Sequence, residues 1–127
     1  MASRLTAKGL EAYCLAKPGA WPDHPWDHEY PVIKVTSRPG TGRIFAFLGA
    51  DTVGVKAGAD REEADEWLRR FPGDVTVMRY IGRSGWNTLS LRGSVPDDEI
   101  RSAVDDSYAR VVSKLARKRR PAGWDEP

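Results

Sequence analysis

The sequence predicts a two-layer α+β fold in which an antiparallel sheet carries its helices on one face, in the order α-β3-α-β2-α. Helical spacing of apolar residues marks the beginning, the middle and the end of the chain, and shorter alternating segments lie between these helices. The connections between neighbouring strands are too short for parallel crossovers. An antiparallel sheet with helices packed on it satisfies both observations.

The length of 127 residues fits one globular domain. We assign residues 1–116 to this domain and expect residues 117–127, which are first basic and then acidic, to form a flexible tail. The longest apolar run, residues 44–50, is too short to cross a membrane, and the N-terminal residues lack a signal-peptide core. The single cysteine excludes an intrachain disulfide. We therefore expect a cytoplasmic protein that is monomeric and does not engage a membrane.

The first helix is predicted over residues 6–16 and ends at the Lys-Pro-Gly sequence that follows. The segment after it, residues 20–31, contains three prolines, which exclude a helix and favour an extended loop or an edge strand. The buried side of the helix is expected to hold Leu10, Tyr13 and Cys14.

Three strands are predicted between the first and second helices. Residues 32–49 form two of them, joined by a hairpin at residues 37–42, where a proline and two glycines supply the turn. Residues 52–56 form the third. These strands alternate so that lysines and apolar residues point to opposite faces.

The second helix is predicted over residues 60–71. Asp60 is its N-cap, and Glu63 follows at the spacing of a capping box. Two further strands, residues 76–81 and 86–91, are expected to flank a hairpin with the sequence Gly-Arg-Ser-Gly.

The last helix runs from Asp97 to Leu115 and is the most strongly patterned segment of the chain. Acidic residues occupy its first turn and basic residues its last, which complements the helix dipole. Its apolar stripe is expected to cover one face of the sheet, against Leu89 and Leu91, and to leave the opposite face, with Trp86, open. The stripe consists of Ile100, Val104, Tyr108, Val111 and Leu115.

The net charge of +2 is small, but its distribution is uneven. Residues 30–50 and 75–96, which contain the predicted strands and hairpins, have no acidic residue. If these segments form the sheet, its turns are positive and the helices carry the negative charge.

Several motifs, taken in order, resemble the MmcQ/YjbR family of small bacterial proteins over about residues 5–116. The motifs are VIKV, GRIFAFLG, VGVK and VPDDEI, followed by DDSYARVVSKL. The resemblance implies a fold of the kind called CyaY-like or secretion-chaperone-like, and a DNA-binding role with a double-wing motif. It carries no role over to residues 20–31 or to the long turn at residues 37–43, which depart from the family pattern. The positions that match it are Phe45, Lys56, Trp86, Ser107 and Tyr108.

The two predicted hairpins are the first candidates for a nucleic-acid contact. As wings, they would place arginines against phosphate groups; the alternative is that they are solvated turns, with arginine serving solubility. The arginines concerned are Arg38, Arg43, Arg79 and Arg83. The basic run at residues 117–120 has the same two interpretations, a phosphate-binding extension or a solvated helix end.

Strand alternation places Lys34 and Lys56 on the same sheet face as Trp86. An aromatic platform among cations is a common way to hold single-stranded nucleic acid. The alternative is a tryptophan covered by the C-terminal tail or by the proline-rich segment.

No metal site, cofactor or enzymatic activity is expected. His24 and His28 are four residues apart among acids, but Pro25 breaks the helix that would aim both rings at one ion. Cys14 lies on an apolar stripe, where a small inert thiol is expected rather than a nucleophile. The sequence also lacks a nucleophile elbow, a phosphate-binding loop and a dinucleotide fingerprint.

Taken together, these features favour a small non-enzymatic module that binds DNA weakly and without sequence specificity. The second hypothesis is a protein- or peptide-binding module that uses the open sheet face. A large exposed apolar patch around Trp86 would favour this alternative.

Overall fold

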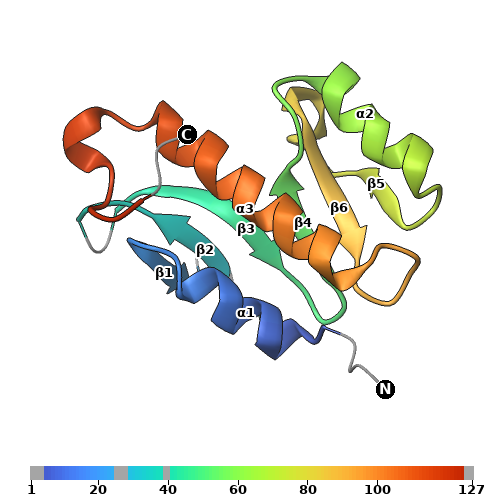
Figure 1. The fold of residues 1–127 in the computed structure, drawn as a ribbon, viewed down its shortest axis with the longest axis horizontal. Helices are drawn as coiled ribbons and strands as arrows, with labels where there is room; N and C mark the ends of the chain where they lie inside the picture. Colours follow the sequence, from blue (N-terminus) through green and yellow to red (C-terminus); the bar gives the residue numbers. More distant parts are fainter. Residues whose placement is uncertain (1–4, 25–28, 39–40, 125–127) are drawn as a thin grey trace.

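The computed structural model describes residues 5–24, 29–38 and 41–124. Three helices lie against an antiparallel sheet, and the longest of them crosses the sheet diagonally (Figure 1). The elements in chain order are α1 (Ala7–Leu15), β1 (Ala20–Asp23), β2 (Val32–Val35), β3 (Arg43–Leu48), β4 (Thr52–Lys56), α2 (Arg61–Arg70), β5 (Val75–Val77), the 3-10 turn η1 (Gly82–Ser84), β6 (Trp86–Ser90), α3 (Asp97–Lys114) and the 3-10 turn η2 (Arg117–Arg119).

The sheet confirms the predicted α+β class. Its six strands have the order β1-β2-β3-β4-β6-β5, and every neighbouring pair is antiparallel. Four strands instead of the predicted three precede α2, because the edge-strand alternative for the proline-rich segment holds and β1 forms within it. Pro22 lacks a donor, but an edge strand tolerates proline, and β1 pairs only with β2.

The predicted hairpin before β6 was also wrong in detail. β5 ends at Val77, well before residue 81, and a loop containing η1 connects it to β6. Tyr80 has a φ of 68°, which interrupts an extended strand. Gly82 packs closely, since a Cβ there would lie 2.3 Å from the Val77 side chain.

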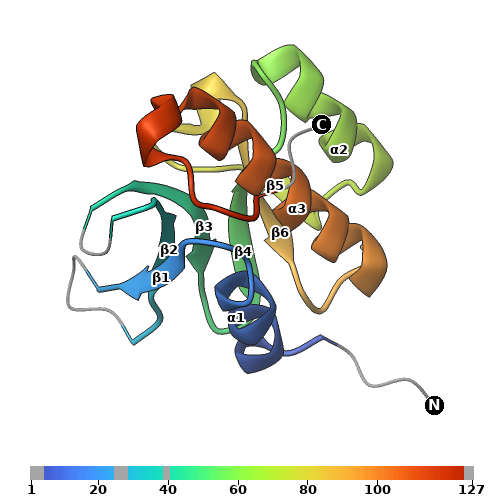
Figure 2. The same ribbon diagram turned by 60° about the vertical axis from the view of Figure 1, so that its left-hand side comes forward.

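Helix α3 docks as its apolar stripe predicts. Figure 2 shows α1 and α3 on the same side of the sheet. The five predicted stripe residues are all buried and share one core with Leu89 and Leu91. Asn87 lies on this face too, and its side-chain amide donates to the Ala64 carbonyl oxygen of α2 at 2.8 Å. All three helices therefore cover one face.

A β-bulge in β3 controls which aromatic rings face the helices. Ile33 pairs with Ala46 whereas Lys34 pairs with Ile44, so Phe45 is the extra residue. Phe45 is fully buried and meets Tyr108 of α3 edge-on, with ring centroids 5.2 Å apart. Residues beyond the bulge are shifted by one position, so that Phe47 falls on the other face of the sheet.

The N-cap of α2 is formed as predicted. The Asp60 side chain accepts a hydrogen bond from the Glu63 backbone N–H at 3.0 Å. The Glu63 carboxylate accepts from the Ala59 N–H at 2.9 Å. In a standard capping box the donor is the N–H of the N-cap itself, one residue later.

The segment after α3 has a defined place beside the β2–β3 connection. Ser37 donates through its backbone N–H to the Arg119 carbonyl oxygen at 2.8 Å and through its hydroxyl to that of Lys118 at 3.0 Å. Pro121 is buried against Gly19. The flexibility of residues 117–127 and the boundary at residue 116 stay predictions. Within the described ranges, no helix is both long and apolar enough to cross a membrane.

Candidate nucleic-acid interface

One end of the sheet carries a groove, and we call this end the groove end. Here β4 finishes and β3 and β6 begin, and the C-terminal half of α3 passes close by. The groove has a volume of about 880 Å³. Its lining consists of Lys34, Gly42, Arg43, Ile44, Phe47, Lys56, Ala59, Ile81, Trp86, Arg110, Val111, Ser113 and Lys114.

The lining is strongly positive. It contains five cationic residues and, among the residues that the structure describes, no carboxylate. Two of the cations are neutralised from outside the groove: Lys34 pairs with Asp23 at 2.7 Å, and Arg110 pairs with Asp106 at 2.8 Å. Arg43 and Lys114 form no ion pair with any described residue. Excess positive charge therefore belongs to these two residues and Lys56.

Lys56 is the most constrained of these cations. Its ammonium group donates to the Ser84 carbonyl oxygen, a neutral partner. Burial lowers the pKa of Lys56, and the nearby charges of Arg110 and Lys114 lower it further. An anion close to Lys56 would favour its charged form.

Two aromatic rings lie on the sheet face inside the groove. Trp86 and Phe47 meet edge-on, with centroids 5.5 Å apart and an angle of 82° between the rings. Gly54 separates their strands, and a Cβ there would lie 2.9 Å from the Met78 sulfur. Met78 thus covers the centre of a face that the sequence predicted to be open. Trp86 remains partly exposed at the groove end.

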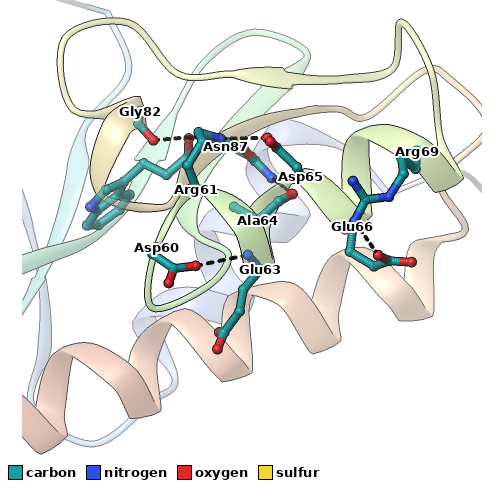
Figure 3. A network of polar contacts seen from close by, with 10 residues as sticks. Asp60, Arg61, Glu63, Ala64, Asp65, Glu66, Arg69, Gly82 and Asn87 are labelled. Atoms are coloured by element: carbon teal, nitrogen blue, oxygen red, sulfur yellow. Dashed lines mark hydrogen bonds and ion pairs between the residues drawn. The ribbon is translucent and has the colours of Figure 1, made fainter.

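Arg61 positions the segment that bears Trp86 (Figure 3). Its guanidinium donates to the Gly82 carbonyl oxygen at 2.6 Å, to that of Trp86 at 3.1 Å, and to the Asn87 side chain. Asp65 fixes the guanidinium from the next turn of α2 at 2.6 Å. Arg61 therefore ties η1 and the start of β6 to α2.

The structure brings the predicted site residues to one end of the sheet but not into one surface. Lys34, Arg43, Lys56 and Trp86 line the groove together. The other predicted residues are exposed on the two connections beside it, Arg38 before β3, and Arg79 and Arg83 before β6. Residues 39–40 of the first hairpin lie outside the described residues. The basic turn η2 lies beside the first connection through its bonds to Ser37.

Among the groove residues that were not predicted as site residues are two cations and two large apolar side chains. The cations are Arg110 and Lys114, whose spacing of four residues places them on one face of α3. Phe47 was missed because the bulge changes its face, and Ile81 because its strand ends early.

Of the remaining candidates, Cys14 and His24 are described by the structure, and neither lines the groove. His28 and Asp27 lie outside the described residues. Within the described parts of the chain, no three His, Cys, Asp or Glu side chains are grouped to hold a metal ion. Burial raises the pKa of Cys14 to about 12, so its thiol stays protonated at neutral pH and is a poor nucleophile.

The fold and groove define a small α+β domain with a cationic, aromatic groove at one sheet end. The YjbR family model matches residues 15–110, and the chain belongs to this family. It is 32% identical over 120 residues to the protein YjbR of Escherichia coli K12, covering 91% of this chain and 95% of that protein, and the O157:H7 protein gives the same values.

Two crystal structures share the fold. A Deinococcus radiodurans protein with the domain DUF419 has a TM-score of 0.77 at 23% identity, with 90% of this chain and 84% of that chain covered. A Pseudomonas syringae protein has a TM-score of 0.63 at 18% identity, with 82% and 97% covered.

The five positions matched by the family motifs form one connected set of contacts. The Ser107 hydroxyl donates to the Phe45 carbonyl oxygen at 2.7 Å and accepts from the Lys56 N–H at 2.9 Å. Tyr108 meets the Phe45 ring, and Lys56 pairs with Trp86 across the sheet. This set links the α3 core contacts directly to the groove.

Proposed function

We propose that this protein is a small non-enzymatic DNA-binding module whose groove end contacts the phosphate backbone. The observation that carries the proposal is the groove itself, in which five cations and no described carboxylate surround two aromatic rings. Phosphate contacts supply most of the affinity of nonspecific DNA binding. The module acts as a cytoplasmic monomer in this proposal, and its affinity is weak.

The arrangement of charge favours an extended anion over a single small one. Arg43, Lys56 and Lys114 lie inside the groove, while Arg38 and Arg83 stand on connections beside it. Positive groups spread in this way can follow successive phosphates of a backbone. The alternative of solvated turns explains the exposed arginines but not the partly buried Lys56.

Anisotropy titrations with labelled DNA over a series of salt concentrations test the proposal. Affinity for duplex should be micromolar or weaker at physiological salt and should fall as salt rises, because binding releases counterions. The combined change Arg38→Ala, Arg43→Ala and Arg83→Ala should flatten the salt slope by up to about three units, roughly one per lost phosphate contact.

Two controls accompany this experiment. Arg92→Ala removes an exposed arginine near Asp51, away from the groove, and should leave the slope unchanged. Arg117→Ala with Lys118→Ala removes two exposed charges of η2 and measures its share without cutting away the buried Pro121. Absence of binding by the parent at low salt would overturn the DNA proposal.

A second candidate function is peptide binding at the β5 edge of the sheet. The observation that favours it is the position of Val77, Tyr80 and Ile81, which are the exposed large hydrophobic side chains among the described residues. β5 is an edge strand, and an extended peptide can add to such an edge. Photocrosslinking to Val77 of a peptide that carries a diazirine group, with no effect of the arginine substitutions, would support this candidate.

A further inference from the structure

Tyr80 occupies a strained turn at the tip of the β5–β6 connection. Its φ is 68°, and the Ile81 N–H donates across it to the Arg79 carbonyl oxygen at 2.7 Å. A three-residue turn with positive φ at its centre is the rare and strained form of γ-turn. Strain of this kind in a residue other than glycine is concentrated at functional sites.

The fold gains no burial from the Tyr80 ring, which is 95% exposed. The residues around it are cationic or line the groove. Ile81, the next residue, lines the groove, and Arg79 and Arg83 are exposed on either side in the sequence. The Lys56 ammonium group binds the same connection at the Ser84 carbonyl oxygen. An aromatic ring is thus presented to solvent beside a cationic groove.

We propose that the groove takes single-stranded nucleic acid, with an unpaired base stacked on Tyr80 and the adjoining nucleotide held against Trp86. This inference rests on the proposed function and narrows its ligand. The phosphates of the strand lie against Arg43, Lys56 and Lys114. An exposed aromatic ring stacks on any base, because every base has a π-face.

The size of the groove favours a single strand over a duplex. Its volume of about 880 Å³ lies within the range of roughly 300–1,000 Å³ that is typical of small-ligand sites. A short stretch of one strand fits such a space, with its phosphates against the lining cations and one nucleotide against Trp86. The paired bases of a duplex are inaccessible to Tyr80 and Trp86, so a duplex would contact only the arginines at the rim.

The deciding comparison uses a labelled oligothymidylate and a duplex of equal length, titrated at one low salt concentration. The parent should bind the single strand more tightly. Tyr80→Gly should weaken single-strand binding by about tenfold or more, as expected for one lost stacked base, and should leave duplex binding unchanged. Tyr80→Phe should retain the parent affinity because it keeps the ring.

Thr76→Ala is the matched control, because Thr76 is exposed on the preceding strand but does not line the groove. It should bind both ligands as the parent does. Trp86→Phe provides an independent signal: oligothymidylate should quench tryptophan fluorescence of the parent more than that of the variant. Tyr80→Gly is expected to fold, since glycine adopts positive φ without strain.

The outcomes separate this inference from the function on which it rests. Equal affinity for the two ligands, or full single-strand affinity in Tyr80→Gly, would overturn the single-strand inference. The proposed DNA-binding function would still stand in that case if duplex binding weakened with rising salt. Failure of both ligands to bind would overturn both proposals.

Discussion

The two ends of the sheet use their charged residues in different ways. At the end opposite the groove, which we call the turn end, carboxylates bind backbone groups: Asp74 accepts from the Ser94 N–H at 2.9 Å, and Asp97 accepts from the Leu5 N–H at 2.8 Å. At the groove end, Arg43 and Lys114 have no ionic partner among the described residues. The two carboxylates at the turn end therefore hold backbone groups in place, whereas Arg43 and Lys114 at the groove end are available to a ligand.

The largest expected losses of stability should be similar at both ends, because one apolar core runs beneath them. Ile100 begins the buried stripe of α3 near the turn end, and Leu115 finishes it near the groove end. Ile100→Ala and Leu115→Ala should each lower the free energy of unfolding by on the order of 2 kcal/mol or more, through lost burial and a new cavity. Urea denaturation measures both; a small loss at Leu115 alone would show that α3 is weakly docked at the groove end.

The next largest loss of stability should be confined to the turn end. Asp74→Ala removes a carboxylate that accepts from both the N–H and the hydroxyl of Ser94, the latter at 2.7 Å. Hydrogen bonds to charged groups contribute about 1.5–3 kcal/mol, so the variant should be less stable by about 2 kcal/mol. Arg43→Ala at the groove end is the control and should change stability by less than about 0.5 kcal/mol. Equal losses in the two variants would remove the contrast between the ends.

At the groove end, one substitution should increase stability. Tyr80→Gly relieves a positive φ of 68° at a side chain that is 95% exposed. The variant should gain up to about 1 kcal/mol, the lower part of the range for such strain, because glycine also makes the unfolded chain more flexible. Thermal denaturation compares it with Tyr80→Ala, which keeps the strain. A destabilised glycine variant would show that the ring supports the fold.

The smallest effect concerns the pH dependence of stability at the groove end. Burial, with Arg110 and Lys114, lowers the pKa of Lys56 below its ordinary value of 10.5. The unfolded chain then binds more protons between the lowered pKa and 10.5, so stability should rise with pH across this window and the penalty should persist below it. Melts of the parent and of Lys56→Gln at neutral pH and near pH 10.5 measure this, and the stability of the parent relative to the variant should rise with pH. A parent that loses stability relative to the variant would contradict the lowered pKa.

The sequence alone determined the α+β class, the docked face of α3 and the joint placement of Lys34, Lys56 and Trp86. Each depends on local periodicity, since side chains alternate along a strand and recur every three to four residues along a helix. Only the tertiary structure decided the rest of the groove. The bulge at Phe45 sets the face of Phe47, and the crossing of α3 brings Arg110 and Lys114 to the groove end. Both features depend on strand register and on packing between distant segments, which no local sequence pattern encodes.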